Sequence, residues 1–166
     1  MKKASQADKA YQAGDYQGVH ENPVWRDRAN FIIAAYLGQK DGRNEWEQLW
    51  ARRVSENRFT LCCIPFFAED LALGDEVETD ARHIVTRVVN PSGHYTFRIW
   101  FGNSTYPGVK DEVITELERI SIEYEWSSEN LLGVSAPSED VAQQIANYLF
   151  DRQGKGHLIY ETGRTQ

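Results

Sequence analysis

The sequence has few of the residues that carry metal or nucleophilic chemistry. Its 166 residues include only two cysteines, Cys62 and Cys63, and four histidines scattered along the chain. Neighbouring side chains of a strand point to opposite faces, so two adjacent cysteines in a strand-like stretch cannot easily reach each other. The sequence therefore excludes a disulfide framework, and with it the main sign of a secreted protein.

Basic residues are also in deficit. The chain has 18 Lys and Arg against 25 Asp and Glu, which gives a formal net charge of -7 and a pI of about 5.1. Affinity for a nucleic-acid backbone comes from Lys and Arg displacing condensed counterions, so this balance argues against nucleic-acid binding. The same balance favours a basic partner protein.

Long apolar runs are missing as well. The first twenty residues have a basic start without the apolar core of a signal peptide, and no later stretch approaches the roughly 18 apolar residues of a membrane span. A hydrophobic fraction of 41% is nevertheless typical of a globular protein. We therefore expect a folded cytoplasmic protein that does not enter the membrane.

The first half of the chain predicts a small twisted β-rich lobe. Residues 1–22 are polar and are expected to form a flexible or helical N-terminal arm. Residues 24–90 contain apolar runs typical of short strands, among them "RFTLCCIPFF". One stretch differs, because "EWEQLWARRV" places Trp46, Leu49 and Trp50 at spacings of three and four, which favours a helical turn or two.

The second half predicts a more regular lobe over residues 91–166. "HIVTRVV" and "YTFRIWF" are joined by the turn-rich "NPSGH" and are expected to pair as a hairpin. Residues 95–161 then follow the order β-α-β-β-α-β, that of a ferredoxin-like split βαβ fold, with Ser138 as a helix N-cap. The predicted fold class is α+β, with both lobes forming one compact unit.

The candidate sites for metal or enzymatic chemistry are weak. "AEDLALGDEVETD" is rich in carboxylates, but Leu71, Ala72 and Leu73 break the ligand spacing of an EF-hand. No phosphate-binding loop, nucleophile elbow or Cys-His pairing motif is present. We therefore expect no metal, no cofactor and no catalytic residue, and the apolar neighbours of the cysteines predict burial instead of reactivity.

Acidic residues are concentrated in two places. Between Asp111 and Asp140 nine acidic residues stand against one basic residue, Arg119, so this span carries -8. Such charges either blunt an edge strand and keep the protein soluble, or form a surface that meets a cationic partner. Under the second interpretation the partner-binding residues are Asp111, Glu112, Glu116, Glu118, Glu123, Glu125 and Glu129, with a second patch of Glu69, Asp70, Glu76 and Glu78.

The run from residue 47 to residue 80 carries a characteristic set of residues: Glu47, Leu49, Trp50, Ala51, Ile64, Pro65, Phe66, Leu71, Gly74, Asp75 and Val77. In these positions it resembles a bacterial family known only as domain of unknown function four-two-six-five (DUF4265). The resemblance implies membership of the family but brings no catalytic residue with it. Small acidic families of this character are often immunity partners of bacterial toxins. This chain is similar to such proteins in size and charge, which is an analogy between classes of protein.

Three hypotheses follow for the function. The first is a non-enzymatic immunity protein that neutralises a cognate toxin, basic and directed at nucleic acid, through the acidic surface. The second is a ferredoxin-like regulatory or small-ligand-binding domain with its pocket between the two lobes. The third is an enzyme that uses a carboxylate of the 69–80 loop, Asp70 or Asp75. The sequence leaves all three open.

Overall fold

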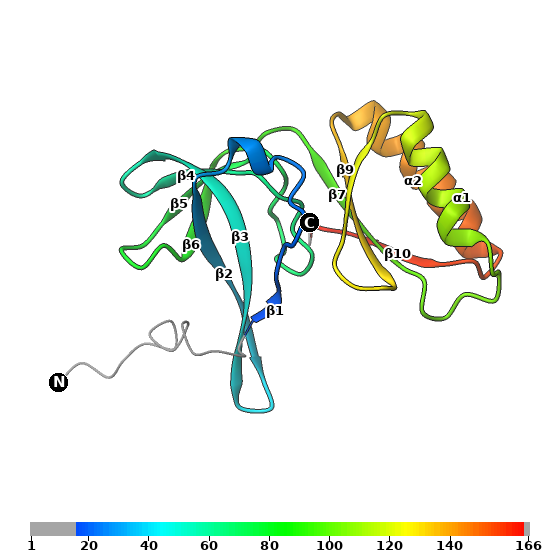
Figure 1. Cartoon of the computed structure of the whole chain (residues 1–166), viewed down its shortest axis with the longest axis horizontal. Coiled ribbons are helices and arrows are strands. Elements are labelled where there is room, and N and C mark those ends of the chain that lie inside the picture. The colour runs from blue at the N-terminus through cyan, green and yellow to red at the C-terminus, as the bar shows by residue number, and fades with distance from the viewer. Residues whose placement is uncertain (1–15, 165–166) are drawn as a thin grey trace.

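A computed structural model describes residues 16–164 of the chain (Figure 1). Within these residues the protein is an α+β structure with two β-sheets and two α-helices. Residues 1–15 of the expected N-terminal arm lie outside the described residues. The rest of that segment is part of the fold, because residues 16–18 form a strand and His20 is buried.

The first sheet forms a curled β lobe. It has six strands in the order β1-β3-β4-β5-β6, and β2 pairs with the other side of β3. All pairs are antiparallel except β1 with β3. The bounds are β1 (Tyr16–Gly18), η2 (Arg26–Arg28, a 3-10 turn), β2 (Phe31–Lys40), β3 (Arg43–Ser55), β4 (Arg58–Leu61), β5 (Glu76–Thr79) and β6 (Val85–Asn90).

The helical turn expected in "EWEQLWARRV" is wrong, because this stretch lies inside the long strand β3. Asp41 and Gly42 both have positive φ, 52° and 76°, and form the tight turn that pairs β3 with β2. Glu47, Leu49 and Ala51 are every second residue of β3, and all three lie on its buried face. Pairing on both sides thus overrides the spacing of the tryptophans, since strand preference depends strongly on tertiary context.

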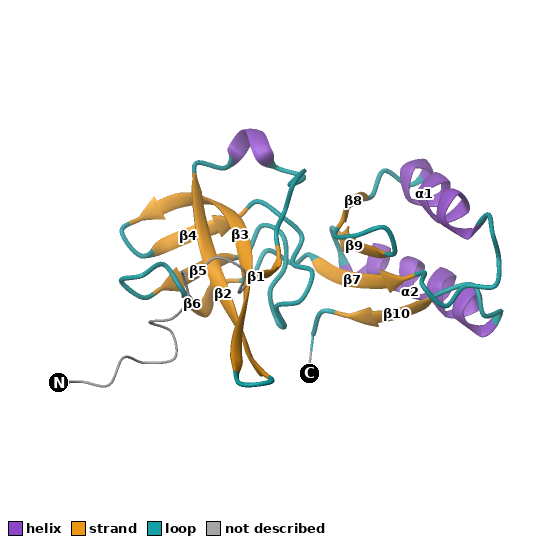
Figure 2. Ribbon diagram, turned by 60° about the horizontal axis from the view of Figure 1, so that its bottom comes forward, coloured by secondary structure: helices purple, strands orange, loops and turns teal. Residues whose placement is uncertain are grey.

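The second sheet has four antiparallel strands in the order β10-β7-β9-β8, so β8 is an edge strand as expected. Two helices cover one face of it (Figure 2). The predicted order β-α-β-β-α-β is confirmed by the elements themselves. They are β7 (Tyr95–Trp100), α1 (Val109–Arg119), β8 (Glu123–Trp126), β9 (Leu131–Ala136), α2 (Glu139–Gly154) and β10 (Ile159–Thr162).

The expected hairpin between "HIVTRVV" and "YTFRIWF" is also wrong. β6 ends the first sheet, whereas β7 lies in the second sheet between β10 and β9. The link between them is held to the first lobe, because the Asp75 carboxylate accepts a hydrogen bond from the Ser92 N–H at 2.8 Å. The turn-rich sequence therefore carries the chain from one sheet to the other.

Alternation along β7 sets the two faces of the second sheet. Phe97 and Ile99 are buried with the apolar faces of α1 and α2. The Ser138 hydroxyl accepts a hydrogen bond from Val141 N–H at 3.3 Å, which confirms the predicted N-cap of α2. Neither helix of the described part is long and apolar enough to cross a bilayer.

The other face of the second sheet packs against the β lobe. Gly133 of β9 allows a close approach, because a Cβ atom there would lie 3.1 Å from Ile64 and 3.2 Å from the Phe66 ring. A side chain at this position has to push the two lobes apart by a few tenths of an ångström.

We expect Gly133→Ala to lower the free energy of unfolding by about 1–3 kcal/mol, because it overpacks the contact between the lobes. Gly154→Ala is the matched control, since a Cβ atom there meets nothing within 4 Å. That variant should gain about 0.4–1 kcal/mol through the lower entropy of its unfolded chain. Urea titrations measure both, and equal effects of the two variants would contradict the packing argument.

Candidate functional site

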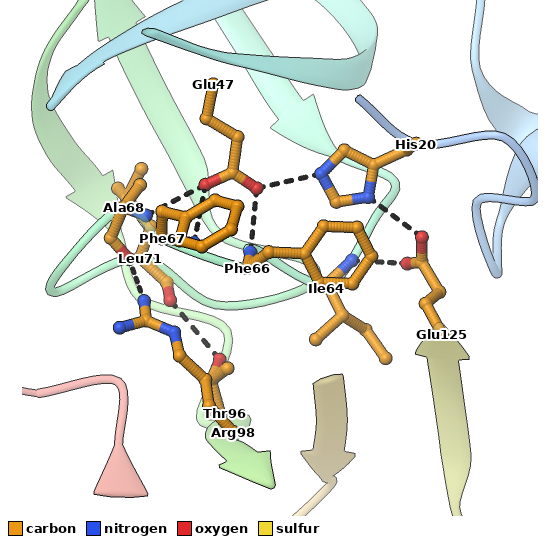
Figure 3. Close-up of polar contacts among 10 residues, drawn as sticks. All are labelled: His20, Glu47, Ile64, Phe66, Phe67, Ala68, Leu71, Thr96, Arg98 and Glu125. Carbon is orange, nitrogen blue, oxygen red and sulfur yellow. Dashed lines mark hydrogen bonds and ion pairs between the residues drawn. The ribbon is translucent and has the colours of Figure 1, made fainter. Parts of the chain in front are cut away.

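The main cluster of buried charge lies where the two lobes meet (Figure 3). His20 comes from the segment after β1, Glu47 from β3 and Glu125 from β8. The imidazole donates from Nε2 to Glu47 Oε2 and from Nδ1 to Glu125 Oε1, each at 2.8 Å. Its ring also stacks on Phe66, with 4.2 Å between the ring centroids and 10° between the planes. One side chain therefore joins a carboxylate of each lobe.

The two carboxylates also hold the chain segment that separates the lobes. Glu47 accepts backbone hydrogen bonds from Phe66 at 2.7 Å, from Phe67 at 2.9 Å and from Ala68 at 2.8 Å. Glu125 accepts a further one from the Ile64 N–H. Every buried amide bound in this way avoids the cost of losing water without a replacement. The charges thus fix the backbone of residues 64–68.

The environment of His20 keeps its ring protonated. Burial alone lowers the pKa of His20, but contacts with Cys63, Glu125 and Glu47 outweigh it and raise the pKa above its usual value. Burial raises the pKa of the Cys63 thiol, so that thiol is neutral at physiological pH and the two carboxylates supply the stabilisation. Burial also acts to raise the pKa of Glu47, but the imidazolium and the backbone amides lower it overall.

A second buried charge, Arg98 of β7, crosses the same boundary. It is 4% exposed, and its guanidinium donates to the Ala68 carbonyl and to Glu69 Oε1, the latter at 2.9 Å. Close by, Asp70 N–H donates to the Gly163 carbonyl at 2.7 Å. Residues 68–70 of the first lobe are therefore tied to β7 and to Gly163, the residue that follows β10.

The acidic residues predicted to bind a partner on the lobe that contains α1 and α2 fall into two groups, those of α1 and those of β8 with its following turn. On α1, Asp111 and Glu118 are exposed, and Glu118 accepts a hydrogen bond from the Tyr124 hydroxyl at 2.8 Å. Glu112 and Glu116 are one helical turn apart, and each is neutralised by an arginine. Glu112 is paired with Arg152 at 2.5 Å, and Glu116 with Arg119 at 2.6 Å.

The acidic residues of β8 face the other lobe. Glu123 accepts a hydrogen bond from Trp25 Nε1 at 3.0 Å, and Glu125 is 4% exposed in the His20 cluster. Glu125 therefore does not lie on the partner-facing surface on which the sequence analysis placed it. Glu129, in the turn after β8, is exposed.

The second predicted patch lies on the β lobe. Glu69 and Asp70 are exposed in the loop after Phe67, while Glu76 and Glu78 lie half-buried in β5. Glu78 is paired with Arg87 at 3.1 Å and with Arg58 at 3.8 Å, and Glu76 accepts a hydrogen bond from Asn90. The structure thus separates Glu69 and Asp70, on a loop at the lobe boundary, from Glu76 and Glu78, which lie in the sheet.

The cysteines and Asp75, which were considered for catalysis or metal binding, are buried in the structure. Both cysteines are free and buried, and burial raises the pKa of Cys62 to about 11. Asp75 is 5% exposed and accepts backbone hydrogen bonds from Ala72 at 3.0 Å and from Ser92. It follows Gly74, whose φ of 83° makes the predicted turn. Within residues 16–164 no group of three His, Cys, Asp or Glu side chains is arranged to hold a metal.

Three buried charged residues were not predicted from the sequence: His20, Glu47 and Arg98. Glu47 had a detectable signal, because in an extended β3 it shares a face with Leu49 and Ala51. A carboxylate on an apolar strand face has to find buried donors. His20 offered no such signal, since its burial depends on the meeting of two lobes.

The comparisons with known proteins agree with this architecture. Residues 47–160 match the family described as "Domain of unknown function (DUF4265)", and the chain belongs to that family. A hypothetical protein from Neisseria gonorrhoeae, described as a novel crystal structure, is similar in fold with a TM-score of 0.66. The two share 20% sequence identity over 80% of this chain and 93% of the other. No curated protein matches.

We expect His20→Gln to destabilise the protein by about 3–5 kcal/mol, because it leaves two buried carboxylates without a counter-charge. His157→Gln is the control: His157 is another histidine, half-buried and outside the cluster, and its loss should cost less than about 0.5 kcal/mol. Urea unfolding at pH 7 measures the difference. Comparable stabilities of the two variants would show that the buried charge is not needed.

The pH dependence of stability tests the same cluster. The pKa of His20 is raised in the folded protein from an ordinary value of 6.5, so its stabilisation is complete below pH 6.5 and declines as pH rises. The wild-type free energy of unfolding should fall by up to about 1.4 kcal/mol per pH unit above that point, relative to His20→Gln. Comparison of the two up to about pH 8 avoids titration of unfolded thiols, whose ordinary pKa is 9.0. Parallel pH profiles would contradict a protonated His20.

Proposed function

We propose that this protein is a non-enzymatic immunity protein that binds and neutralises a basic toxin domain through an acidic surface on α1. The observation that carries the proposal is the position of α1, which lies on the side of the molecule away from the β lobe (Figure 1) and bears exposed carboxylates. Asp111 and Glu118 are exposed there, and Glu129 is exposed in the nearby turn after β8. Exposed carboxylates of one sign steer a cationic partner and speed its association.

The pairing on α1 supports a refined version of that surface. Glu112 and Glu116 each hold an arginine, so the uncompensated charge rests on Asp111, Glu118 and Glu129. Among the described residues neither Asp111 nor Glu129 forms an ion pair. Arginine-bound carboxylates keep their side chains in fixed positions, while the unpaired ones remain available to a partner.

The buried charges favour a structural role over a catalytic one. His20, Glu47, Glu125 and Arg98 are occupied by one another or by backbone groups at the lobe boundary. A catalytic carboxylate or histidine has to reach a substrate, and these groups are sealed from solvent. We therefore place the function on the exterior of the protein.

A small-ligand domain is the second candidate. We propose that residues 91–166 form a ferredoxin-like lobe, and one hollow of about 430 Å³ lies between it and the β lobe. Asp75 and Pro91 line one side, and Thr96 and Arg164 the other. The volume is in the usual range of small-molecule pockets. Under this candidate, a metabolite raises the melting temperature of the wild type but not that of a Thr96→Val variant.

The first experiment is capture of partners by the tagged full-length protein, together with the product of the adjacent reading frame, at low and at high salt. A stoichiometric basic protein that is lost at high salt supports the immunity function. Absence of any partner at both salt concentrations contradicts it and favours the small-ligand domain.

We expect the double reversal Asp111→Lys and Glu118→Lys to reduce the association rate with that partner about 10-fold at low salt, with little change in folding. Asp27→Lys with Glu56→Lys is the control, because both residues are exposed on the β lobe and the change in net charge is the same. Stopped-flow or surface-based kinetics measure both. Equal slowing by the two variants would mean that net charge, and not the α1 surface, guides association.

A further inference from the structure

Among the described residues, β6 has an edge that no other strand of the β lobe pairs with. β6 is the last strand of the first sheet and pairs with β5 on one side only. On its other side the sheet meets β2 at a single bridge, Ala34 to Ile84, just before β6 begins. Beyond that bridge the outward backbone groups of residues 85–90 have no strand partner within the described part of the chain. Such an edge is a template for another extended segment.

A groove follows this edge. One hollow of about 400 Å³ is lined by Val85 to Val88 on one side and by Ala35, Tyr36 and residues 68–71 on the other. A second hollow, the one of about 430 Å³ described above, continues past Val88 to Pro91. The two share Asp70, Leu71 and Val88, so they form one elongated groove. Six residues of strand span about 20 Å, which is the length of β6.

We propose that this groove binds an extended segment of the partner protein, which adds a strand to β6 and places a Lys or Arg side chain beside Glu69 and Asp70. The inference rests on the proposed function in one respect, namely that the basic partner supplies the segment. Strand addition is a recurring mode of peptide recognition in which backbone hydrogen bonds give affinity and side-chain pockets give specificity.

The lining of the groove suits such a segment. Leu71, 8% exposed, and Val88, half-buried, form an apolar floor for alternate side chains of a strand. A free strand edge offers donors and acceptors along its whole length, which an extended backbone can match. A compact metabolite cannot use that series of groups.

The charges along the groove favour a basic segment. Glu69 is held in place by the buried Arg98 while its side chain remains 46% exposed, and Asp70 is exposed beside it. Arg87, on the opposite side of the groove, is paired with Glu78 at 3.1 Å. Arg164 lies at the far end and stacks on Tyr95 at 4.5 Å. Asp75 contributes little, since its carboxylate is occupied by backbone amides.

The test uses the full-length protein and a synthetic hexapeptide, acetyl-Val-Lys-Val-Lys-Val-Lys amide, with the corresponding Val-Glu peptide as its charge control. We expect the lysine peptide at millimolar concentration to shift the backbone amide resonances of residues 85–90, and the glutamate peptide not to. No shift in residues 85–90, or shifts confined to α1, overturns the inference. So does equal binding of the two peptides.

Variants of Glu69 and Asp70 test whether these two carboxylates contact the lysine side chains of the peptide. Glu69→Gln keeps an acceptor for Arg98, and Asp70→Asn suits the left-handed backbone of Asp70, whose φ is 59°. Together they should weaken the lysine peptide about 3-fold or more. Asp27→Asn with Glu56→Gln removes the same charge from exposed positions elsewhere on the β lobe and should leave peptide binding unchanged. Indistinguishable affinities of the two double variants would also overturn the inference.

The groove and the immunity function fail in different ways. If the peptide binds along β6 but no basic protein is captured, the proposed function is wrong and the groove stands. If a basic partner is captured and its affinity is the same with Glu69→Gln and Asp70→Asn, the function stands and the groove is not its site.

Discussion

The arrangement of the two lobes depends on one buried positive charge. Glu47 and Glu125 approach the same point from different sheets, and two carboxylates in a low-dielectric interior repel each other unless a cation lies between them. The His20 imidazolium does this and stacks on Phe66 at the same time. Because the carboxylates also bind the amides of residues 64–68, the same charge sets the path of the chain between the lobes.

This boundary explains how one acidic stretch of sequence has two physical roles. The carboxylates of β8 point toward the β lobe, where Trp25 and His20 bind them. Those of α1 lie on the opposite side of the sheet, where two arginines neutralise half of them and the rest meet solvent. The second sheet is thus covered on both faces, by helices on one and by residues 62–75 on the other. The groove along β6 borders the same segment, so any partner bound there contacts residues that join the lobes.

Much of the second lobe was predictable from local patterns. The order of elements after residue 95 and the Ser138 cap each depend on a few neighbouring residues, and both are confirmed. The errors lie where distant partners decide. The spacing of Trp46, Leu49 and Trp50 fits a helix, but β2 and β4 pair with this stretch and make it a strand. Likewise "NPSGH" has the composition of a hairpin turn, yet Asp75 ties it to the first lobe and its flanking strands enter different sheets.

The sequence by itself determined the family, the α+β class, the order of elements after residue 95 and the excess of negative charge, because composition and short-range periodicity carry these properties. Only the tertiary structure decided which carboxylates are surface and which are core. Glu123, Glu125 and Glu129 look alike in the sequence, yet they hold Trp25, hold His20 and meet solvent, respectively. The physical reason is that the environment of a charge depends on residues about a hundred positions away, such as His20, whose own burial exists only once both lobes have packed.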